Sequence, residues 1–220
     1  MVGPTFYDAL VQFGRWPLHT DVLAEARHSR CVFIEPHFDD VAFSCGGTLS
    51  ALAQQGTALD LVTVCTADPD AGQPLSPLAR RLHDEWGAAT HPYVQRRGEG
   101  DQVRRRLHIN LVWLGVAEAL YRRPHCTAMH ELLDGSMPPA ADPAFQTVIT
   151  RLGSVLPARG RVTIFAPLGI GGHQDHRLVH AAVRTLALQR PDWSVWYYED
   201  VPYAFGTQPV KDRLQALEGY

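Results

Sequence analysis

The residues best suited to chemistry lie in two short clusters that are far apart in the sequence. The first is HFDD at residues 37–40, which directly follows an apolar run. The second is HQDH at residues 173–176, which follows another apolar run and a glycine-rich turn. Two histidines and one carboxylate are a common ligand set for catalytic zinc, with a fourth position left for water. The two clusters therefore predict a metal site that activates water for hydrolysis.

The simpler explanation for either cluster is a helix N-terminus. Aspartate is favoured there by the helix dipole and can cap exposed amides. That explanation accounts for one aspartate, but not for a histidine with two carboxylates and a matching second cluster. We therefore favour a metal site.

The elements that must position these clusters alternate along the whole chain. Strands are expected at 31–35, 59–65, 110–114, 161–166 and 193–198. Helices are expected at 4–28, 43–55, 78–86, 93–107, 143–156 and 176–188, with a loop at 66–76 and an irregular excursion at 121–142. This alternation predicts a three-layer, Rossmann-like α/β fold with a mostly parallel sheet, formed by residues 1–220 as one domain. Ligands bind beyond the carboxyl ends of such strands, so the topology brings the two clusters to the same edge.

The composition excludes several classes of protein. A formal net charge of −3 gives no electrostatic reason to expect nucleic acid or an anionic membrane as a partner. No stretch approaches the roughly 18 uninterrupted apolar residues of a transmembrane helix, and no signal peptide is expected. The four cysteines lack CxxC spacing and are expected to be free thiols, as in a reducing cytoplasm. We expect a cytoplasmic protein that acts on a small molecule. The sequence leaves open whether it forms a homo-oligomer.

The two clusters resemble the two motifs of the LmbE / PIG-L family of zinc-dependent N-deacetylases. The matching stretches are HFDD, the SCGG that follows it, and GHQDH, and the resemblance spans roughly residues 31–203. It implies removal of an acetyl group from an N-acetylated amino sugar: a glycoside, a thiol precursor or a natural-product intermediate. The implied cofactor is Zn²⁺, with Fe²⁺ as the other candidate.

The same resemblance assigns roles to the residues of the two clusters. His37, Asp40 and His176 match the three metal ligands. Asp39 matches the general base that acts on the water. His173 matches the histidine that, once protonated, stabilises the oxyanion or protonates the leaving amine. Asp175 is then expected to orient and charge-balance the His173 ring.

Three further residues are expected to contact the substrate. Arg96 resembles an arginine that holds the substrate, although a solvated helix face explains it nearly as well. Glu118 lies where relatives bind sugar hydroxyls. Phe38 replaces the proline that is usual in the family, so we expect it to border the pocket and to influence substrate choice. The stretch YYEDVPYA at 197–204 is expected near the pocket, without an assigned role.

Three other functions fit part of the pattern. An amidase acting on a thiol conjugate or a natural-product amide would use the same fold and metal. A non-haem Fe²⁺ oxygenase also uses two histidines and one carboxylate, but such centres usually lie in double-stranded β-helix folds, which the β-α alternation contradicts. A metal- or sugar-binding protein without turnover would need neither Asp39 nor His173.

Overall fold

The computed structural model describes residues 22–70, 72–86 and 92–218. Its centre is a parallel sheet with strand order β3-β2-β1-β4-β5. The strands are β1 (Arg30–Glu35), β2 (Leu59–Cys65), β3 (Asn110–Val116), β4 (Val162–Pro167) and β5 (Trp193–Tyr198). The predicted Rossmann-like α/β fold is confirmed. Of the helix expected at 4–28, the part before residue 22 lies outside the described residues.

Strand β1 lies in the middle of the sheet because its side chains are apolar on both faces. Val32 and Ile34 pack into the core on one face, and Cys31 and Phe33 pack into the core on the other. All four are at most 1% exposed. Alternation of side chains across a strand produces this division, and only a central strand can bury both sets.

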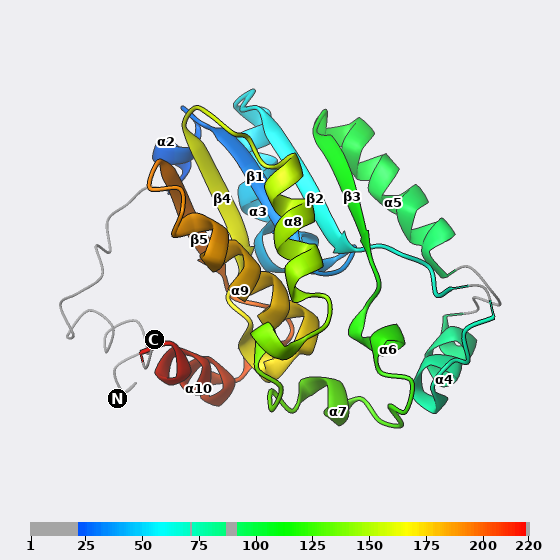
Figure 1. The fold of residues 1–220 in the computed structure, drawn as a ribbon. Coiled ribbons are helices and arrows are strands. Elements are labelled where there is room, and N and C mark those ends of the chain that lie inside the picture. The colour runs from blue at the N-terminus through cyan, green and yellow to red at the C-terminus, as the bar shows by residue number, and fades with distance from the viewer. Residues whose placement is uncertain (1–21, 71, 87–91, 219–220) are drawn as a thin grey trace, which may run out of the picture.

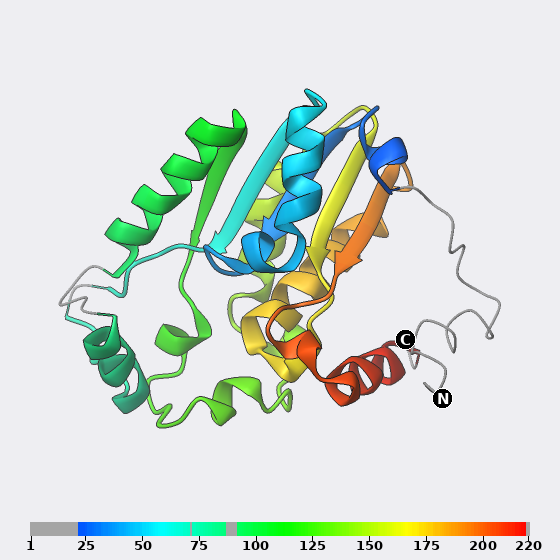
Figure 2. The ribbon, with the colours of Figure 1, turned by 180° about the vertical axis from the view of Figure 1, so that it is seen from behind.

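Helices cover the two faces of the sheet, and a third group lies at one end. The helices are α2 (Val22–Ala26), α3 (Asp40–Gln54), α4 (Pro77–Glu85), α5 (Pro92–Leu107), α6 (Ala119–Arg122), α7 (His130–Leu133), α8 (Phe145–Val155), α9 (Gln174–Ala187) and α10 (Thr207–Glu218). Helices α8 and α9 pack on one face, and α2, α3 and α5 lie on the other (Figures 1 and 2). Helices α4, α6, α7 and α10 lie beyond the carboxyl ends of the strands (Figure 1). Within the described part of the chain, no helix is both long enough and apolar enough to cross a bilayer.

Most expected elements occur where the sequence places them, but α10 was not expected, and two other regions differ from the prediction. Strand β3 continues through Gly115 to Val116, because Gly115 adopts a positive φ of 66° where the pairing with β2 shifts register. The expected excursion at 121–142 contains α7 and the 3-10 helix η1 (Pro139–Ala141). It is anchored by the ion pair between Arg122 and Asp142, both largely buried. Hydrophobic periodicity could not predict these helices, because each is too short for the pattern of apolar residues to repeat.

The glycine-rich turn after β4 depends on close backbone contact. Gly172 has a φ of +77°, and a Cβ at this position would overlap the backbone carbonyl oxygen of Leu133. We expect Gly172→Ala to lower the free energy of unfolding by about 3 kcal/mol, as overpacking adds to left-handed strain. Gly56→Ala is the matched control, because φ there is +73° but no atom lies within 4 Å of the added carbon. It should lose only about 1–2 kcal/mol in a denaturant titration. Equal losses would contradict the packing argument.

One buried histidine on α9 makes stability depend on pH. The Nδ1 atom of His180 lies 3.0 Å from the carbonyl oxygen of Pro167. Burial, reinforced by Arg213, lowers the pKa of His180 from 6.5 to about 4, although Asp200 opposes the shift. Below pH 6.5 the unfolded chain binds a proton at His180 more readily than the folded protein does. The stability that the neutral, buried ring provides is therefore fully present above pH 6.5 and is lost as the pH falls toward 4. The loss amounts to roughly 3 kcal/mol at 1.36 kcal/mol per pKa unit. His180→Gln should remove this component from the pH dependence of unfolding, and an unchanged dependence would contradict the assignment.

Candidate functional site

The two sequence clusters meet at the carboxyl edge of the sheet. His37 lies in the turn after β1, Asp40 begins α3, and His176 lies in the first turn of α9. One possible ligand atom from each lies within 4.8 Å of the other two. His37 Nδ1 is 3.3 Å from Asp40 Oδ2, and His176 Nε2 is 3.4 Å from Asp40 Oδ1. The backbone N–H of His37 also donates to Asp40 Oδ2 at 2.7 Å, which fixes the tight turn.

Each of these histidines has a second carboxylate on its far side. His37 Nε2 lies 3.1 Å from Asp175, and His176 Nδ1 lies 2.6 Å from Asp200. The other oxygen of Asp200 accepts the backbone N–H groups of the turn after β4. Metal-bound histidines have this arrangement, because the outer carboxylate orients the ring and makes the inner nitrogen a better donor.

The charges inside the cluster suit a cation. Burial acts to raise the pKa of Asp40, but His176 and His37 hold it well below its usual range. Burial acts to lower the pKa of His37, yet Glu118 and Asp175 raise it well above the ordinary value. The carboxylates of the cluster therefore concentrate negative charge, and protons on the rings of His37 and His176 partly neutralise it. A divalent ion among the same donors would take the place of those protons, so the residues fit a metal ion.

His173 differs from the neighbouring histidines. Its Nδ1 accepts the backbone N–H of Asp175 at 3.2 Å, so the proton of the neutral ring is on Nε2. Burial, with the rings of His37 and His176, lowers the pKa of His173 to about 3. These surroundings favour a neutral ring that donates from Nε2, whereas the expected role used a protonated ring. The catalytic role of His173 stays a prediction.

Asp175 hydrogen-bonds to a different histidine from the one expected, although its charge still acts on His173. Its carboxylate contacts His37 rather than hydrogen-bonding to the ring of His173. It is fully buried, accepts the backbone N–H of Ala119 at 2.9 Å and forms an ion pair with Arg122 at 2.8 Å. Arg122 and His37 hold the pKa of Asp175 well below the usual range despite burial. Asp175 is thus an outer partner of His37, and Arg122 anchors it.

Two residues in this arrangement were missed from the sequence: Asp200 and Arg122. Asp200 lies within the stretch 197–204, which was expected near the pocket, but its partnership with His176 had no local signal. Arg122 lies in the excursion whose structure had no periodicity. Only the adjacency of β4 and β5 and the path of α6 bring these residues to the site.

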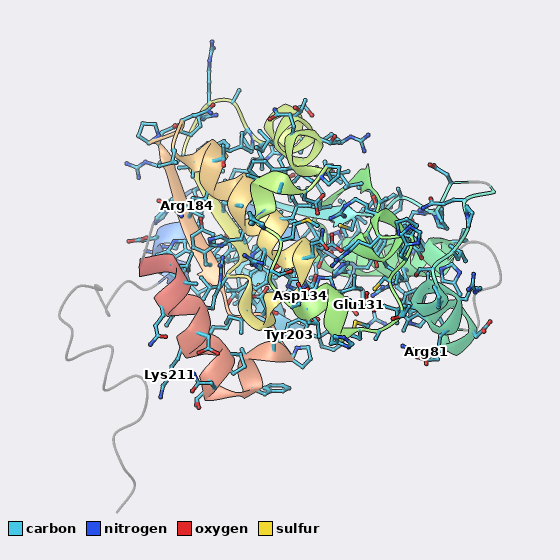
Figure 3. The ribbon with its side chains drawn as sticks, turned by 60° about the horizontal axis from the view of Figure 1, so that its bottom comes forward. Arg81, Glu131, Asp134, Arg184, Tyr203 and Lys211 are labelled. Carbon is cyan, nitrogen blue, oxygen red and sulfur yellow. The ribbon has the colours of Figure 1, made fainter. Side chains whose placement is uncertain are left out.

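The remaining expected residues surround a cavity of about 330 Å³. The catalytic cluster contributes His37, Asp39, Asp40, His173 and His176 to its lining, joined by Arg96, Glu118 and Tyr203. Figure 3 labels Tyr203 beside the start of the C-terminal segment, and its ring centroid is 5.6 Å from that of His176. The stretch 197–204 thus reaches the cavity through Val201, Pro202 and Tyr203.

Asp39, Arg96 and Phe38 form a connected group at the edge of this cavity. Arg96 donates to the half-exposed carboxylate of Asp39 at 2.9 Å. Its guanidinium carbon is 5.5 Å from the ring centre of Phe38, which in turn packs against Tyr93. Phe38 does not itself line this cavity, and its expected influence on substrate choice stays a prediction. It supports Arg96, whereas the exposed Phe43 lies at the cavity.

Glu118 lies in the cavity wall with one carboxylate oxygen unpaired within the described part of the chain. It is 7% exposed, and its Oε1 has no hydrogen-bond partner among the described residues. Burial raises its pKa, although His37 opposes that shift. An orphaned, buried carboxylate oxygen is costly unless a ligand satisfies it. This makes Glu118 a candidate for binding a hydroxyl group.

We expect Asp200→Asn to weaken metal binding by about 10–100-fold, because the amide holds the His176 ring less firmly and makes it a poorer donor. The measurement is competition for Zn²⁺ against a chromophoric chelator. The matched control is Asp60→Asn, which removes a carboxylate that pairs with Arg30 at the opposite end of the sheet. Equal affinity in Asp200→Asn and the unchanged protein would refute the role of Asp200.

The fold and the donor set together define a class: an α/β protein with two histidines and a carboxylate gathered at the carboxyl edge of a parallel sheet, beside a cavity. The chain belongs to the PIG-L family, because the family model described as "PIG-L: GlcNAc-PI de-N-acetylase" matches residues 32–187.

Two curated relatives bear the name 2'-N-acetylparomamine deacetylase. The one from Streptomyces fradiae is 35% identical over 178 residues, covering 81% of this chain and 59% of the relative. The one from Niallia circulans is 29% identical over 187 residues, covering 78% and 66%. The chain therefore spans less than two thirds of the length of either relative.

Solved structures share the fold. The zinc-inhibited form of teicoplanin deacetylase Orf2 matches with a TM-score of 0.61 at 20% identity, over 86% of this chain and 83% of that one. The A40926 pseudoaglycone deacetylase Dbv21 matches with a TM-score of 0.61 at 22% identity, over 87% and 81%. At this level of identity, the likeness shows a common architecture.

Proposed function

We propose that this protein is a metal-dependent amide hydrolase that removes the acetyl group from an N-acetylated amino sugar in natural-product biosynthesis. The observation that carries the proposal is the convergence of His37, Asp40 and His176 within 4.8 Å, with an outer carboxylate on each histidine. The relatives named as deacetylases support the same reaction. The proposed ion is Zn²⁺, which suits nitrogen and oxygen donors, with Fe²⁺ as the alternative. The four free cysteines support a cytoplasmic location.

In this proposal, the protein first fixes the amide. His37, Asp40 and His176 would hold the ion, which when bound lowers the pKa of water and polarises a carbonyl oxygen. Glu118 and Arg96 line the same cavity and would hold sugar hydroxyls. His173 would donate its Nε2–H to the amide oxygen as negative charge develops there.

Asp39 would move the proton. Its carboxylate lines the cavity, and Arg96 restrains it at 2.9 Å. Asp39 takes a proton from the attacking water and returns it to the sugar nitrogen as the carbon–nitrogen bond breaks. The products are acetate and the free amine. In this proposal Asp39 performs both transfers, and His173 acts only as a hydrogen-bond donor.

The test is to measure both products from methyl 2-acetamido-2-deoxyglucoside and from 2'-N-acetylparomamine, with the protein loaded with Zn²⁺. We expect equal amounts of acetate and new primary amine, with the glycosidic bond intact. An amidase for other natural-product amides would leave both sugars unchanged but hydrolyse members of an amide panel. No acetate from either sugar would overturn the proposed function.

A further inference from the structure

One side of the cavity consists of apolar side chains that the proposed reaction does not use. We define this apolar wall as Leu82, Trp86, Leu120, Met129 and Leu132, all of which line the cavity. They come from three regions beyond the strand ends: α4 and the residue after it, α6, and the segment through α7. Separate elements thus bring apolar side chains to one surface beside the charged cluster.

The apolar wall combines a firm base with an exposed rim. Leu120 and Leu132 are each 3% exposed and belong to the packed cluster around Tyr93. Trp86 is 41% exposed and Met129 is 39% exposed. Leaving large apolar groups in water is unfavourable, and their clustering at a cavity is typical of a ligand site. No residue of the wall carries a charge, so its ligand must present apolar surface.

The position of the wall indicates which part of a substrate would reach it. Glu118 immediately precedes α6, the helix that carries Leu120. Tyr203 also lines the cavity, and its ring lies beside His173 and His176. If Glu118 holds the sugar, then the wall, which begins with Leu120 on the adjacent helix, lies next to the sugar, whereas the amide is held at the metal cluster. It therefore faces the group attached to the sugar rather than the acetyl group.

We infer that the apolar wall binds an apolar group joined to the sugar, so that the preferred substrates are N-acetylated amino sugar glycosides with an apolar aglycone. This inference rests on the proposed function, because it places the sugar at Glu118. It adds the chemical class of the aglycone, which neither the metal cluster nor Asp39 determines.

Three synthetic compounds test the inference. They are the methyl glycoside of N-acetylglucosamine, its hexyl glycoside, and the methyl glycoside bearing N-hexanoyl in place of N-acetyl. We expect the hexyl glycoside to have about tenfold or higher kcat/KM than the methyl glycoside, through a lower KM, which is the effect of burying two methylene groups. The N-hexanoyl compound should gain nothing. A gain for that compound instead would assign the wall to the acyl group and overturn the inference.

Substitutions in the apolar wall test whether the preference for the hexyl glycoside arises there. Trp86→Ser combined with Met129→Ser should remove most of the preference for the hexyl glycoside. Leu188→Ser is the matched control, because Leu188 is 81% exposed at the end of α9 and does not line the cavity. It should keep the full preference. A double variant that retains the preference would overturn the inference.

Calorimetric binding of the two glycosides separates this inference from the proposed function. Tighter binding of the hexyl glycoside without any acetate release would support the wall and reject the deacetylase. Acetate release from both glycosides at equal kcat/KM, with equal affinity, would support the deacetylase and reject the wall. Equal or absent binding together with no turnover would reject both.

Discussion

Asp39→Asn is expected to lower kcat by about 10²–10⁴-fold while leaving metal content unchanged. Asparagine has nearly the same size as aspartate, and its carbonyl oxygen can still accept from Arg96, so the 2.9 Å contact should survive in neutral form. What the variant loses is the ability to take a proton from water. Initial rates of acetate release, with metal analysis of the same samples, provide the measurement.

Asp68→Asn is the matched control for this variant. Asp68 forms an ion pair with Arg97 at 2.7 Å, next to the pair of Arg96 with Asp39, but it does not line the cavity. Its replacement should leave kcat within about twofold of the unchanged protein, as surface ion pairs contribute little. A comparable loss of kcat in both variants would mean that loss of an ion pair with an arginine of α5, and not loss of proton transfer, explains the effect of Asp39→Asn.

His176→Gln is expected to abolish both metal binding and acetate release. Removal of a ligand should weaken the site by more than the roughly 10–100-fold that loss of an outer partner causes. His176 is 1% exposed and links Asp40 to Asp200, so no other described side chain can reach the same position without rearrangement. Metal content after dialysis and acetate release after Zn²⁺ addition measure the two losses.

His180→Gln controls for a buried change on the same helix. His180 lies one turn further along α9, and its ring contacts the carbonyl oxygen of Pro167 instead of the cluster. This variant should retain one ion per chain. Thermal unfolding of both variants shows whether each is folded. A folded His176→Gln protein that binds Zn²⁺ as tightly as the unchanged protein would remove His176 from the ligand set.

The architecture could be predicted from local sequence patterns, because each strand is marked by its own run of apolar, β-branched or aromatic residues. Residues 59–65 and 193–198 form strands with the expected ends, since apolar, β-branched or aromatic runs stop there at turn-forming residues. The order of the strands requires more than pattern, but right-handed crossovers leave few alternatives for a β-α chain. The sequence could not reveal α6 and α7, because four-residue helices depend on tertiary contacts rather than on periodicity.

The sequence predicted those site residues whose types and spacing form a motif. It could not predict contacts that depend on how a side chain is oriented in the folded protein. His37, Asp40 and His176 could be brought together by topology alone. Which ring the carboxylate of Asp175 contacts depends on rotamers fixed by Arg122, a residue with no motif of its own. The position of Phe38 also depends on orientation. Its place in the motif predicted a contact with the pocket, but its ring packs against Tyr93 and lies against the guanidinium of Arg96.

The buried pair of Asp175 and Arg122 helps to explain why the cluster can remain ordered. Their side chains are fully and largely buried, and each makes further hydrogen bonds. A buried ion pair contributes little net stability, but loss of one partner leaves the other charge buried and unpaired. The pair therefore fixes the position of His37 through Asp175 rather than adding much to folding.

The central claim is that the cluster of His37, Asp40 and His176 holds one metal ion on which amide hydrolysis depends. The most direct measurement is a Zn²⁺ titration of chelator-treated protein that follows acetate release from the methyl glycoside of N-acetylglucosamine. We expect no release from the metal-free protein and a rise that reaches its maximum at one Zn²⁺ per chain. Undiminished acetate release from protein shown to contain no metal would contradict the claim.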